Sequence, residues 1–473
     1  MDDLPPGQAH HAGLPRCPPP SGVRAHGRVC GGSACWVRVR RPVVPTARVR
    51  SRSPPKRPRS VRSPVTDPLR PRPTLESVGR ARTVDAELIV VGAGPAGSSA
   101  AIRLARRGWR VLVLDRATFP RPKPCGEYLN PGAVRILERL GLLPRVAACG
   151  VRIDGIFLAG PDGTSAWVPF PHGHGVLVRR DVLDHLLVQE ALQAGAEFVE
   201  GCRVEAVHPG RTPAVVTRYR GKMLVLRARL VIGADGMRSV TARATGPLLS
   251  PAHARYTVGA HFEGLACAHP RGDLHLGPGW YVGAALYGGG RGNVVAALPR
   301  SVLRQTRDPA STFARACEAL PLLRGLMRGA RPTEPFVCAG PLGYAPRRMA
   351  AEGLLLAGDA AGTVDPMTGR GIFLALQSAE TASEFAHTAL TTGDPRVLGE
   401  YDRTWRAMFA RLTDLDRLLV WGARRRWLAA WFVRKVAAHP ELGSHLLGAL
   451  NDAPQGRIAW GLRWLGDLLR VGA

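Results

Sequence analysis

Lysine and aromatic residues are scarce in this sequence. Only four of its 65 basic residues are lysine, and aromatic side chains make up 6% of its 473 residues. Arginine nevertheless gives a formal net charge of +29. Such basicity suits nucleic acid or an anionic membrane surface, but here it accompanies the alanine, glycine and proline content typical of a GC-rich genome. We therefore expect no nucleic-acid partner.

Paired cysteines and long apolar runs are absent. The nine cysteines are scattered and include no Cys-x-x-Cys pair, which argues against a disulfide framework or a structural zinc site. His172 and His174 flank a glycine without a third ligand in sight, so we assign no metal. No apolar run reaches the ~20 residues of a membrane span, and the N-terminus has no signal-peptide core. These absences favour a cytoplasmic protein.

Residues 1–82 lack apolar periodicity. They carry 17 arginine and lysine residues against four acidic ones, and their many prolines block helix and sheet alike. We interpret this segment as a disordered extension. One interpretation is a basic arm or a targeting peptide. The other is a dispensable extension that results from a wrongly assigned start codon.

A strand–helix–strand unit begins where the extension ends. Leu88–Val91 is a continuous apolar run, typical of a strand buried on both faces. A glycine turn leads into a helix expected over residues 96–107, and Val111–Leu114 is the next buried strand. A unit of this kind is the core of a dinucleotide-binding fold.

The turn after the first strand has the spacing Gly-x-Gly-x-x-Gly. Gly92 permits the tight exit from the strand, Gly94 lets a pyrophosphate approach the backbone, and Gly97 lets helix and strand pack closely. The pyrophosphate would lie at the helix N-terminus, over Pro95 and Ala96, where free N–H groups and the helix dipole favour anions.

Asp115 follows Gly97 by eighteen residues, with Arg116 beside it. A carboxylate at this point is placed to bind the hydroxyls of an adenosine ribose. The motif alone does not separate NAD from FAD.

Two further glycine turns each follow a buried strand. Leu230–Ile232 runs into Gly233-Ala234-Asp235-Gly236, and Leu354–Ala357 runs into Gly358-Asp359-Ala360-Ala361-Gly362. The order of the three turns resembles the class A flavoproteins, which include para-hydroxybenzoate hydroxylase, geranylgeranyl reductases and flavin-dependent halogenases. This resemblance covers residues 85 to about 390 and implies FAD as the cofactor. It implies that Asp359 binds the ribityl chain and that Asp235 and Gly236 lie near the pyrophosphate.

The segment from Asp365 to Ile372 resembles a stretch of the geranylgeranyl reductases. It reads Asp365-Pro366-Met367-Thr368-Gly369-Arg370-Gly371-Ile372. Gly369 and Gly371 let backbone N–H groups approach the pyrimidine edge of the flavin, and Pro366 fixes the entry. The positive end of the following helix, expected from Gly371 and continuing with Ile372, would stabilise negative charge on reduced flavin.

Two more signals carry the same resemblance. Cys125 and Gly126 match a Pro-x-x-Cys-Gly stretch near the flavin, and Arg180 matches the start of a helix beside the flavin or its phosphates. Cys125 is our candidate for a catalytic residue, because a cysteine beside Lys123 can have a lowered pKa. Alternatively it is a small residue that shapes the loop.

We therefore predict an α/β fold with a Rossmann-like FAD-binding domain similar to para-hydroxybenzoate hydroxylase. This domain would comprise residues 83–155, 176–250 and 340–395. An inserted antiparallel β-sheet, residues 156–175 and 251–339, would bind substrate, with Trp280, Tyr281 and His261 as candidate contacts.

Residues 396–473 read as helical, basic and rich in tryptophan. The stretch from Trp421 to Lys435 mixes tryptophan with arginine. It either rests on an anionic membrane and admits a lipid-like substrate, or forms a helical cap packed on the flavoprotein body.

Three functions fit these motifs. The first is an oxidoreductase that passes a hydride through flavin N5 to a hydrophobic small molecule, as in geranylgeranyl reductases. The second is a monooxygenase that hydroxylates an aromatic or polyketide-like substrate through a C4a-hydroperoxide. The third is a non-catalytic prenyl-binding protein on the same fold. Because only one dinucleotide fingerprint occurs in the sequence, electrons would come from transiently bound NAD(P)H or from a reductase partner.

Overall fold

The computed structural model describes residues 85–249, 254–305 and 308–451, all within one unit of the chain. The predicted disordered extension, residues 1–82, lies outside the described residues, as does the end of the predicted C-terminal helical region, residues 452–473.

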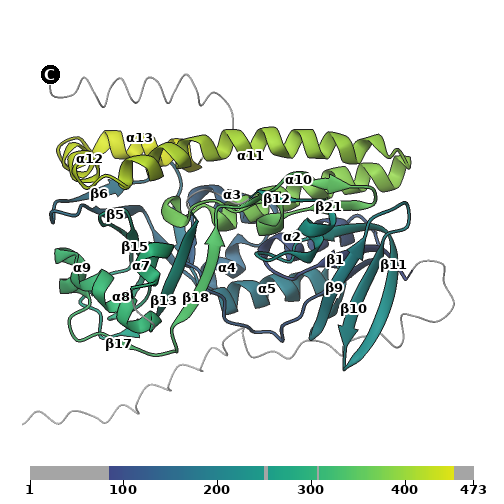
Figure 1. The fold of residues 1–473 in the computed structure, drawn as a ribbon, viewed down its shortest axis with the longest axis horizontal. Helices are drawn as coiled ribbons and strands as arrows, with labels where there is room; N and C mark the ends of the chain where they lie inside the picture. The colour runs from purple at the N-terminus through teal and green to yellow at the C-terminus, as the bar shows by residue number, and fades with distance from the viewer. Residues whose placement is uncertain (1–84, 250–253, 306–307, 452–473) are drawn as a thin grey trace, which may run out of the picture. The chain divides into compact units, whose positions relative to one another are not determined.

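The first sheet is a mainly parallel one whose central strands are the predicted apolar runs (Figure 1). Every residue of the strand Val111–Leu114 is buried, which explains its unbroken apolar sequence. In spatial order the strands are β20 (Ala350–Ala351), β21 (Leu354–Leu356), β11 (Lys222–Gly233), β1 (Ala86–Val91), β2 (Val111–Leu114) and β8 (Glu197–Val199). Only the β20–β21 pair along this path is antiparallel.

Strands β21, β11 and β1 are neighbours and run in the same direction. Each is followed by one of the three glycine turns, so all three turns meet at the carboxyl edge of the sheet. Ligands of doubly wound folds bind at this edge.

Three helices contact the first sheet: α2 (Pro95–Ala105), α5 (Arg180–Gln193) and α10 (Gly371–Thr392). Helix α2 contacts both α5 and α10. Helix α10 also contacts α3 (Pro131–Arg139), which is followed by the short α4 (Leu143–Cys149). A small sheet of β3 (Tyr128–Leu129), β7 (Gly175–Leu177) and β4 (Val151–Ile153) adjoins α3 and α4.

Strand β11 is longer than the predicted strand Leu230–Ile232. It begins at Lys222 and runs to Gly233 without a break. Its first part pairs only with β10 (Ala214–Tyr219) of a ribbon that continues to β9 (Cys202–His208), and there its residues alternate between exposed and buried. Its last part lies between β1 and β21 and is continuously buried. The hydrophobic pattern therefore changes where the pairing partners change.

The second sheet comes from the two predicted inserted segments. Its strands, in order, are β17 (Arg331–Pro332), β13 (Arg255–Glu263), β16 (Arg291–Pro299), β15 (Tyr281–Gly288), β14 (Arg271–Leu276), β5 (Gly155–Ala159) and β6 (Ser165–Pro169), with β18 (Val337–Leu342) paired to β13. The sheet is antiparallel except for the parallel pair β14–β5.

The segment predicted as sheet also contains helices α7 (Arg300–Leu303), α8 (Pro309–Glu318) and α9 (Pro321–Leu326). Their apolar side chains share a core with β13, β15 and β16. Several short elements complete these segments. In sequence, α6 (Val240–Ala244) and β12 (Leu248–Leu249) lie between β11 and β13, β19 (Ala345–Pro346) lies between β18 and β20, and η2 (Gly358–Ala361) and η3 (Pro366–Thr368) lie between β21 and α10.

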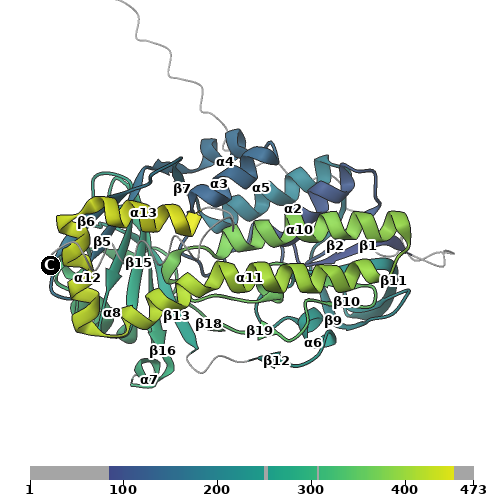
Figure 2. The same ribbon diagram turned by 90° about the horizontal axis from the view of Figure 1, so that it is seen from above.

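Three helices complete the described chain: α11 (Arg396–Ala423), α12 (Arg426–Ala438) and α13 (Pro440–Asn451). Figure 2 shows α11 running alongside α10, and the two helices are in contact. Helices α12 and α13 lie on β6 of the second sheet. Within the described ranges, no helix is both long and apolar enough to cross a bilayer.

Candidate functional site

The turn between β1 and α2 is tightly packed at two of its three glycines. A Cβ atom at Gly92 would lie 2.4 Å from the carbonyl oxygen of Ala234, and one at Gly97 would lie 1.8 Å from that of Gly92. A Cβ at Gly94 would meet only the guanidinium of Arg121, at 3.7 Å. The space beside Gly94 is therefore open and bordered by a positive charge at the N-terminus of α2, as an anion site requires.

Asp115 holds this turn in place. Its carboxylate accepts hydrogen bonds from the backbone N–H groups of Ala93 and Ala117, each at 2.8 Å. A carboxylate has lone pairs left for ribose hydroxyls after two such bonds. Arg116 is exposed beside it.

A cavity of about 760 Å³ extends from the glycine turns to the second sheet and the C-terminal helices. Most of the predicted site residues line it: Gly94, Pro95, Ala96, Cys125, Gly126, Arg180, Gly236, Tyr281, Gly358, Asp359, Pro366, Gly369, Gly371 and Ile372. Seven do not: Gly92, Gly97, Asp115, Arg116, Asp235, Trp280 and His261.

The side chain of Asp235 does not face the cavity. Its carboxylate accepts hydrogen bonds from the hydroxyls of Ser239 and Thr241 and from the amide of Val240, each at 2.6 Å. It therefore holds the N-terminus of α6, and the side chain of Asp235 does not line the cavity. Gly236 is the residue of this turn that reaches the cavity.

Tyr344 joins two glycine turns and was missed by the sequence analysis. Its hydroxyl lies 2.8 Å from the carbonyl oxygen of Asp359 and 3.1 Å from that of Gly236. Burial raises the pKa of this hydroxyl, with further contributions from Asp359 and Asp235. It therefore remains a neutral donor. A single tyrosine in a loop offers no sequence signal for this role.

The segment before α10 presents an unsatisfied polar atom to the cavity. The hydroxyl oxygen of Thr368 is shielded from solvent and has no hydrogen-bond partner within the described ranges, and Thr368 lines the cavity. Buried polar groups in native proteins are nearly always hydrogen-bonded. A Cβ at Gly371 would meet nothing within 4 Å, so the backbone at the start of α10 is open to a ligand.

Asp365 links this segment to the second sheet. The hydroxyl of Tyr281 and the guanidinium of Arg255, the latter at 3.1 Å, both donate hydrogen bonds to its carboxylate. Burial, followed by the charge of Asp365, raises the pKa of Tyr281 well above its ordinary value. Tyr281 therefore positions Asp365 and lines the cavity as a neutral phenol.

Arg180 is buried beside Cys125. Its guanidinium donates two hydrogen bonds to Asp184, at 2.8 and 2.9 Å. Burial by itself would lower the pKa of Arg180, but Asp184 and Cys125 outweigh it and raise the pKa. Arg180 is therefore charged and fixed in orientation at the cavity wall.

Cations surround the cavity near two glycine turns. Arg121 is close to Gly94, and the ammonium of Lys123 lies 3.3 Å from where a Cβ of Gly236 would be. Burial lowers the pKa of Lys123, Asp359 opposes this shift, and Arg180 and Arg121 add to it. An anionic ligand would relieve the mutual repulsion of these cations.

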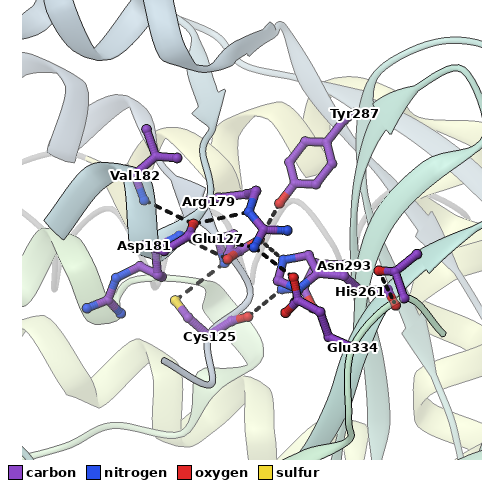
Figure 3. A network of polar contacts seen from close by, with 11 residues as sticks. Cys125, Glu127, Arg179, Asp181, Val182, His261, Tyr287, Asn293 and Glu334 are labelled. Carbon is purple, nitrogen blue, oxygen red and sulfur yellow. Dashed lines mark hydrogen bonds and ion pairs between the residues drawn. The ribbon is translucent and has the colours of Figure 1, made fainter. Parts of the chain in front are cut away.

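A second polar network lies behind the Cys125 loop (Figure 3). Glu127 accepts hydrogen bonds from the hydroxyl of Tyr287, from the backbone N–H of Arg180 at 2.9 Å, and pairs with His261 at 2.9 Å. His261 thus does not line the large cavity where we expected substrate contacts. It lines a small neighbouring cavity instead.

The wall on the substrate side is largely apolar. Alternate residues of β15 face opposite sides, so that Tyr281 and Gly283 line the cavity. Trp280 instead packs in the core formed with Phe313 and Leu323 of α8 and α9, which corrects its predicted placement. Leu419, Phe432 and other residues of α11, α12 and α13 complete the wall.

These features suit one extended dinucleotide that carries a flavin. The open backbone at Gly94, the flanking cations and Asp115 suit its ADP part, and Asp359, Thr368 and Gly371 suit its polar flavin end. By fold and site this chain is a flavoprotein that holds FAD.

The chain belongs to the family described as FAD binding domain, whose model matches residues 85–416, and it is an FAD-dependent oxidoreductase. It is 31% identical to digeranylgeranylglycerophospholipid reductase 1 of Methanothermobacter thermautotrophicus over 68% of this chain and 82% of that one. It is 32% identical to menaquinone reductase of Mycobacterium tuberculosis over 63% of this chain and 76% of that one. The sequence resemblance to the geranylgeranyl reductases is thereby confirmed.

Solved structures show the same fold. The flavin-dependent brominase Bmp2 matches with a TM-score of 0.70 at 18% identity, over 82% of this chain and 98% of that one. The myxobacterial chondrochloren halogenase CndH matches with a TM-score of 0.66 at 23% identity, over 81% and 96%. The predicted fold class, a Rossmann-like FAD-binding domain with an inserted sheet, is confirmed.

Proposed function

We propose that this protein reduces carbon–carbon double bonds in the isoprenoid chain of a lipid. The observation that carries this proposal is the continuity of one cavity from the flavin-binding segments to an apolar chamber. The chamber is walled by Leu274 and Leu276 of the second sheet and by Phe432, Leu446 and Leu447 of the C-terminal helices. A long hydrocarbon gains free energy from such a wall at roughly 25 cal/mol per Å² of buried area.

The names of two similar proteins, a digeranylgeranylglycerophospholipid reductase and a menaquinone reductase, point to the same substrate class. FAD, when bound, supplies the hydride. The chain positions the flavin through Asp359 and the backbone at Gly369 and Gly371, and it orients the double bond against the apolar wall. Electrons reach the site from NAD(P)H bound transiently or from a separate reductase protein.

The chamber opens toward an exposed corner between α11 and α12. Leu418, Trp421 and Trp427 line the cavity and are also exposed, Trp427 by 69%. Three exposed arginines, 424 to 426, lie between them. Tryptophan and arginine together suit the interface of an anionic membrane. We propose that this corner rests on the membrane surface and receives the lipid there.

The proposal is tested with purified yellow protein, reduced by dithionite without oxygen and mixed with a geranylgeranylated phospholipid in detergent. Mass spectrometry should show a gain of two hydrogen atoms per double bond. A second sample receives oxygen and an aromatic substrate. A product that gains one oxygen atom there, with an unchanged lipid in the first sample, would replace this proposal by a monooxygenase. An unchanged lipid that still co-purifies in stoichiometric amount would indicate a prenyl-binding protein.

A further inference from the structure

Glu127 forms a shared wall between the large cavity and a small one. It lines both, its side chain is only 2% exposed, and its backbone has a φ of +55°. Such a conformation is uncommon for a residue other than glycine, and it marks a position that the surroundings hold firmly. A buried carboxylate at the wall of a largely apolar chamber requires partners.

Those partners connect Glu127 to the surface through one histidine. The Nε2 atom of His261 lies 2.9 Å from a carboxylate oxygen of Glu127, and its Nδ1 atom lies 3.1 Å from one of Glu334. The side chain of His261 is 17% exposed and that of Glu334 is 37% exposed. The three side chains thus form an unbroken hydrogen-bonded line from solvent to the cavity wall (Figure 3).

The line has a second access to water. The small cavity has a volume of about 30 Å³ and is lined by Glu127, His261 and Glu334, together with Arg179 and Asp181. Its volume and polar walls meet the requirements for one ordered water molecule. Arg179 donates a hydrogen bond of 2.8 Å to Glu334 and two to Asp181. It therefore fixes the outer carboxylate toward the histidine.

We propose that Glu334, His261 and Glu127 conduct protons from solvent to the large cavity, and that Glu127 donates the proton which completes double-bond reduction. This inference rests on the proposed reductase function. Reduction of a C=C bond adds one hydride and one proton. The hydride carries both electrons, so the relay moves a proton and no electrons. His261 as imidazolium releases its Nε2 proton to the Glu127 carboxylate, and Glu127 passes that proton to the carbon. The neutral ring keeps its Nδ1 proton toward Glu334, and its Nε2 regains a proton that comes from solvent by way of Glu334 and the water of the small cavity.

Other acids at the cavity are less suited to this role. Burial raises the pKa values of Tyr128 and Tyr281, which makes them weaker proton donors. Asp273 is held by two hydrogen bonds from Arg271, at 2.8 and 3.1 Å. Among the acidic side chains that line the large cavity within the described residues, Glu127 is joined by a histidine to an exposed carboxylate.

The pKa of His261 gives a signal that is independent of turnover. Burial lowers this pKa, but the hydrogen bond and charge of Glu127 and the charge of Glu334 raise it above its ordinary value, against the opposing charge of Arg179. Removing the charge of Glu127 should therefore lower it. A histidine that serves only as packing would not report the charge of Glu127 in this way.

The test uses the flavin-loaded full chain with Glu127→Gln, His261→Gln and Glu334→Gln, and with His208→Gln, an exposed histidine on β9, as the matched control. Two-dimensional NMR should show a lower His261 pKa in Glu127→Gln than in wild type. Single-turnover lipid reduction in the pre-reduced enzyme should slow at least tenfold in Glu127→Gln and His261→Gln. Glu334→Gln should change the pH dependence of this rate, and His208→Gln should behave as wild type. All variants should keep full FAD content.

An unchanged His261 pKa in Glu127→Gln, or wild-type rates and pH dependence in both His261→Gln and Glu334→Gln, would overturn the relay. Wild-type protein that leaves the lipid unreduced would instead overturn the proposed function. If Glu127→Gln fails to fold, the pH dependence of the rate in Glu334→Gln still tests the relay. The Glu334 side chain is half-exposed, and the oxygen of the new amide can accept the same hydrogen bond from His261.

Discussion

Gly94 and Gly97 are three residues apart in one turn, but their surroundings differ. A methyl group at Gly97 would overlap the carbonyl oxygen of Gly92, whereas one at Gly94 would enter the open space near Arg121. Gly97 is therefore required by the fold, whereas Gly94 is required only if a ligand occupies that space.

We therefore expect Gly97→Ala to destabilise the protein itself and Gly94→Ala to weaken FAD binding with little effect on the flavin-free protein. The affinity loss should be tenfold or more, because the pyrophosphate must approach this backbone closely. Gly399→Ala, at an exposed helical position with no neighbour within 4 Å, is the control and should stabilise by about 0.5–1 kcal/mol. Thermal unfolding with and without FAD, and flavin titration, measure these effects. Equal FAD affinity in Gly94→Ala and wild type would contradict the assignment.

The glycine turns could be predicted because their reason is local: a strand must turn sharply into a helix. Asp235 and Tyr344 could not. The carboxylate of Asp235 can bind either a ligand or the N-terminus of α6. It binds the helix because Ser239 and Thr241 fold back and donate hydrogen bonds to it. Tyr344 reaches carbonyl groups at two turns that are far apart in sequence. Roles of this kind depend on tertiary packing, which sequence spacing does not contain.

Among the elements, the start of α10 is held to α11 by a buried ion pair. Arg370 is fully buried and donates to the carbonyl oxygen of Leu412 at 2.6 Å and to Asp416 at 3.1 Å. Arg370 lies between Gly369 and Gly371, so the pair also fixes the backbone that faces the flavin end of the cavity.

Replacing Asp416 by leucine leaves the Arg370 charge buried without its carboxylate. We expect a loss of roughly 3–5 kcal/mol in the free energy of unfolding. The double variant Arg370→Met/Asp416→Leu should regain most of it, because both groups are then apolar. Urea unfolding followed by fluorescence gives both values. Equal stability of the single and double variants would show that the pair does not join these helices.

A strand whose residues are all buried has an unbroken apolar sequence and could be predicted, as β2 illustrates. The unbroken course of β11 from Lys222 through the predicted strand Leu230–Ile232 was not predicted, and neither were the helices α7 to α9. In β11 the environment changes along one strand. Helices α8 and α9 find their apolar partners on the second sheet, so their stability comes from a surface that their own sequence does not reveal.

At the scale of the whole molecule, the corner of exposed tryptophan and arginine between α11 and α12 is the proposed membrane contact. Each basic residue near an anionic surface contributes about 1 kcal/mol. Vesicles that contain phosphatidylglycerol should sediment the protein, and phosphatidylcholine vesicles should not.

Changing arginines 424 to 426 to glutamate should weaken this binding at least a hundredfold, as should high salt in the wild type. The matched control changes Arg211, Arg220 and Arg227, exposed residues of the β9–β10–β11 ribbon and its connecting loops, to glutamate. This control alters the net charge equally. If both triple variants bind alike, binding follows overall charge and the corner has no special role.

The position of the chamber wall in the chain has a consequence for biosynthesis. Every described residue assigned to the flavin precedes α11, whereas the wall against the hydrocarbon is completed by α12 and α13. Because a chain leaves the ribosome from its N-terminus, a nascent polypeptide can acquire its cofactor while the compartment for the lipid is still open. Flavin loading would thus come before substrate access is restricted, and the bulky dinucleotide need not pass through the finished entrance.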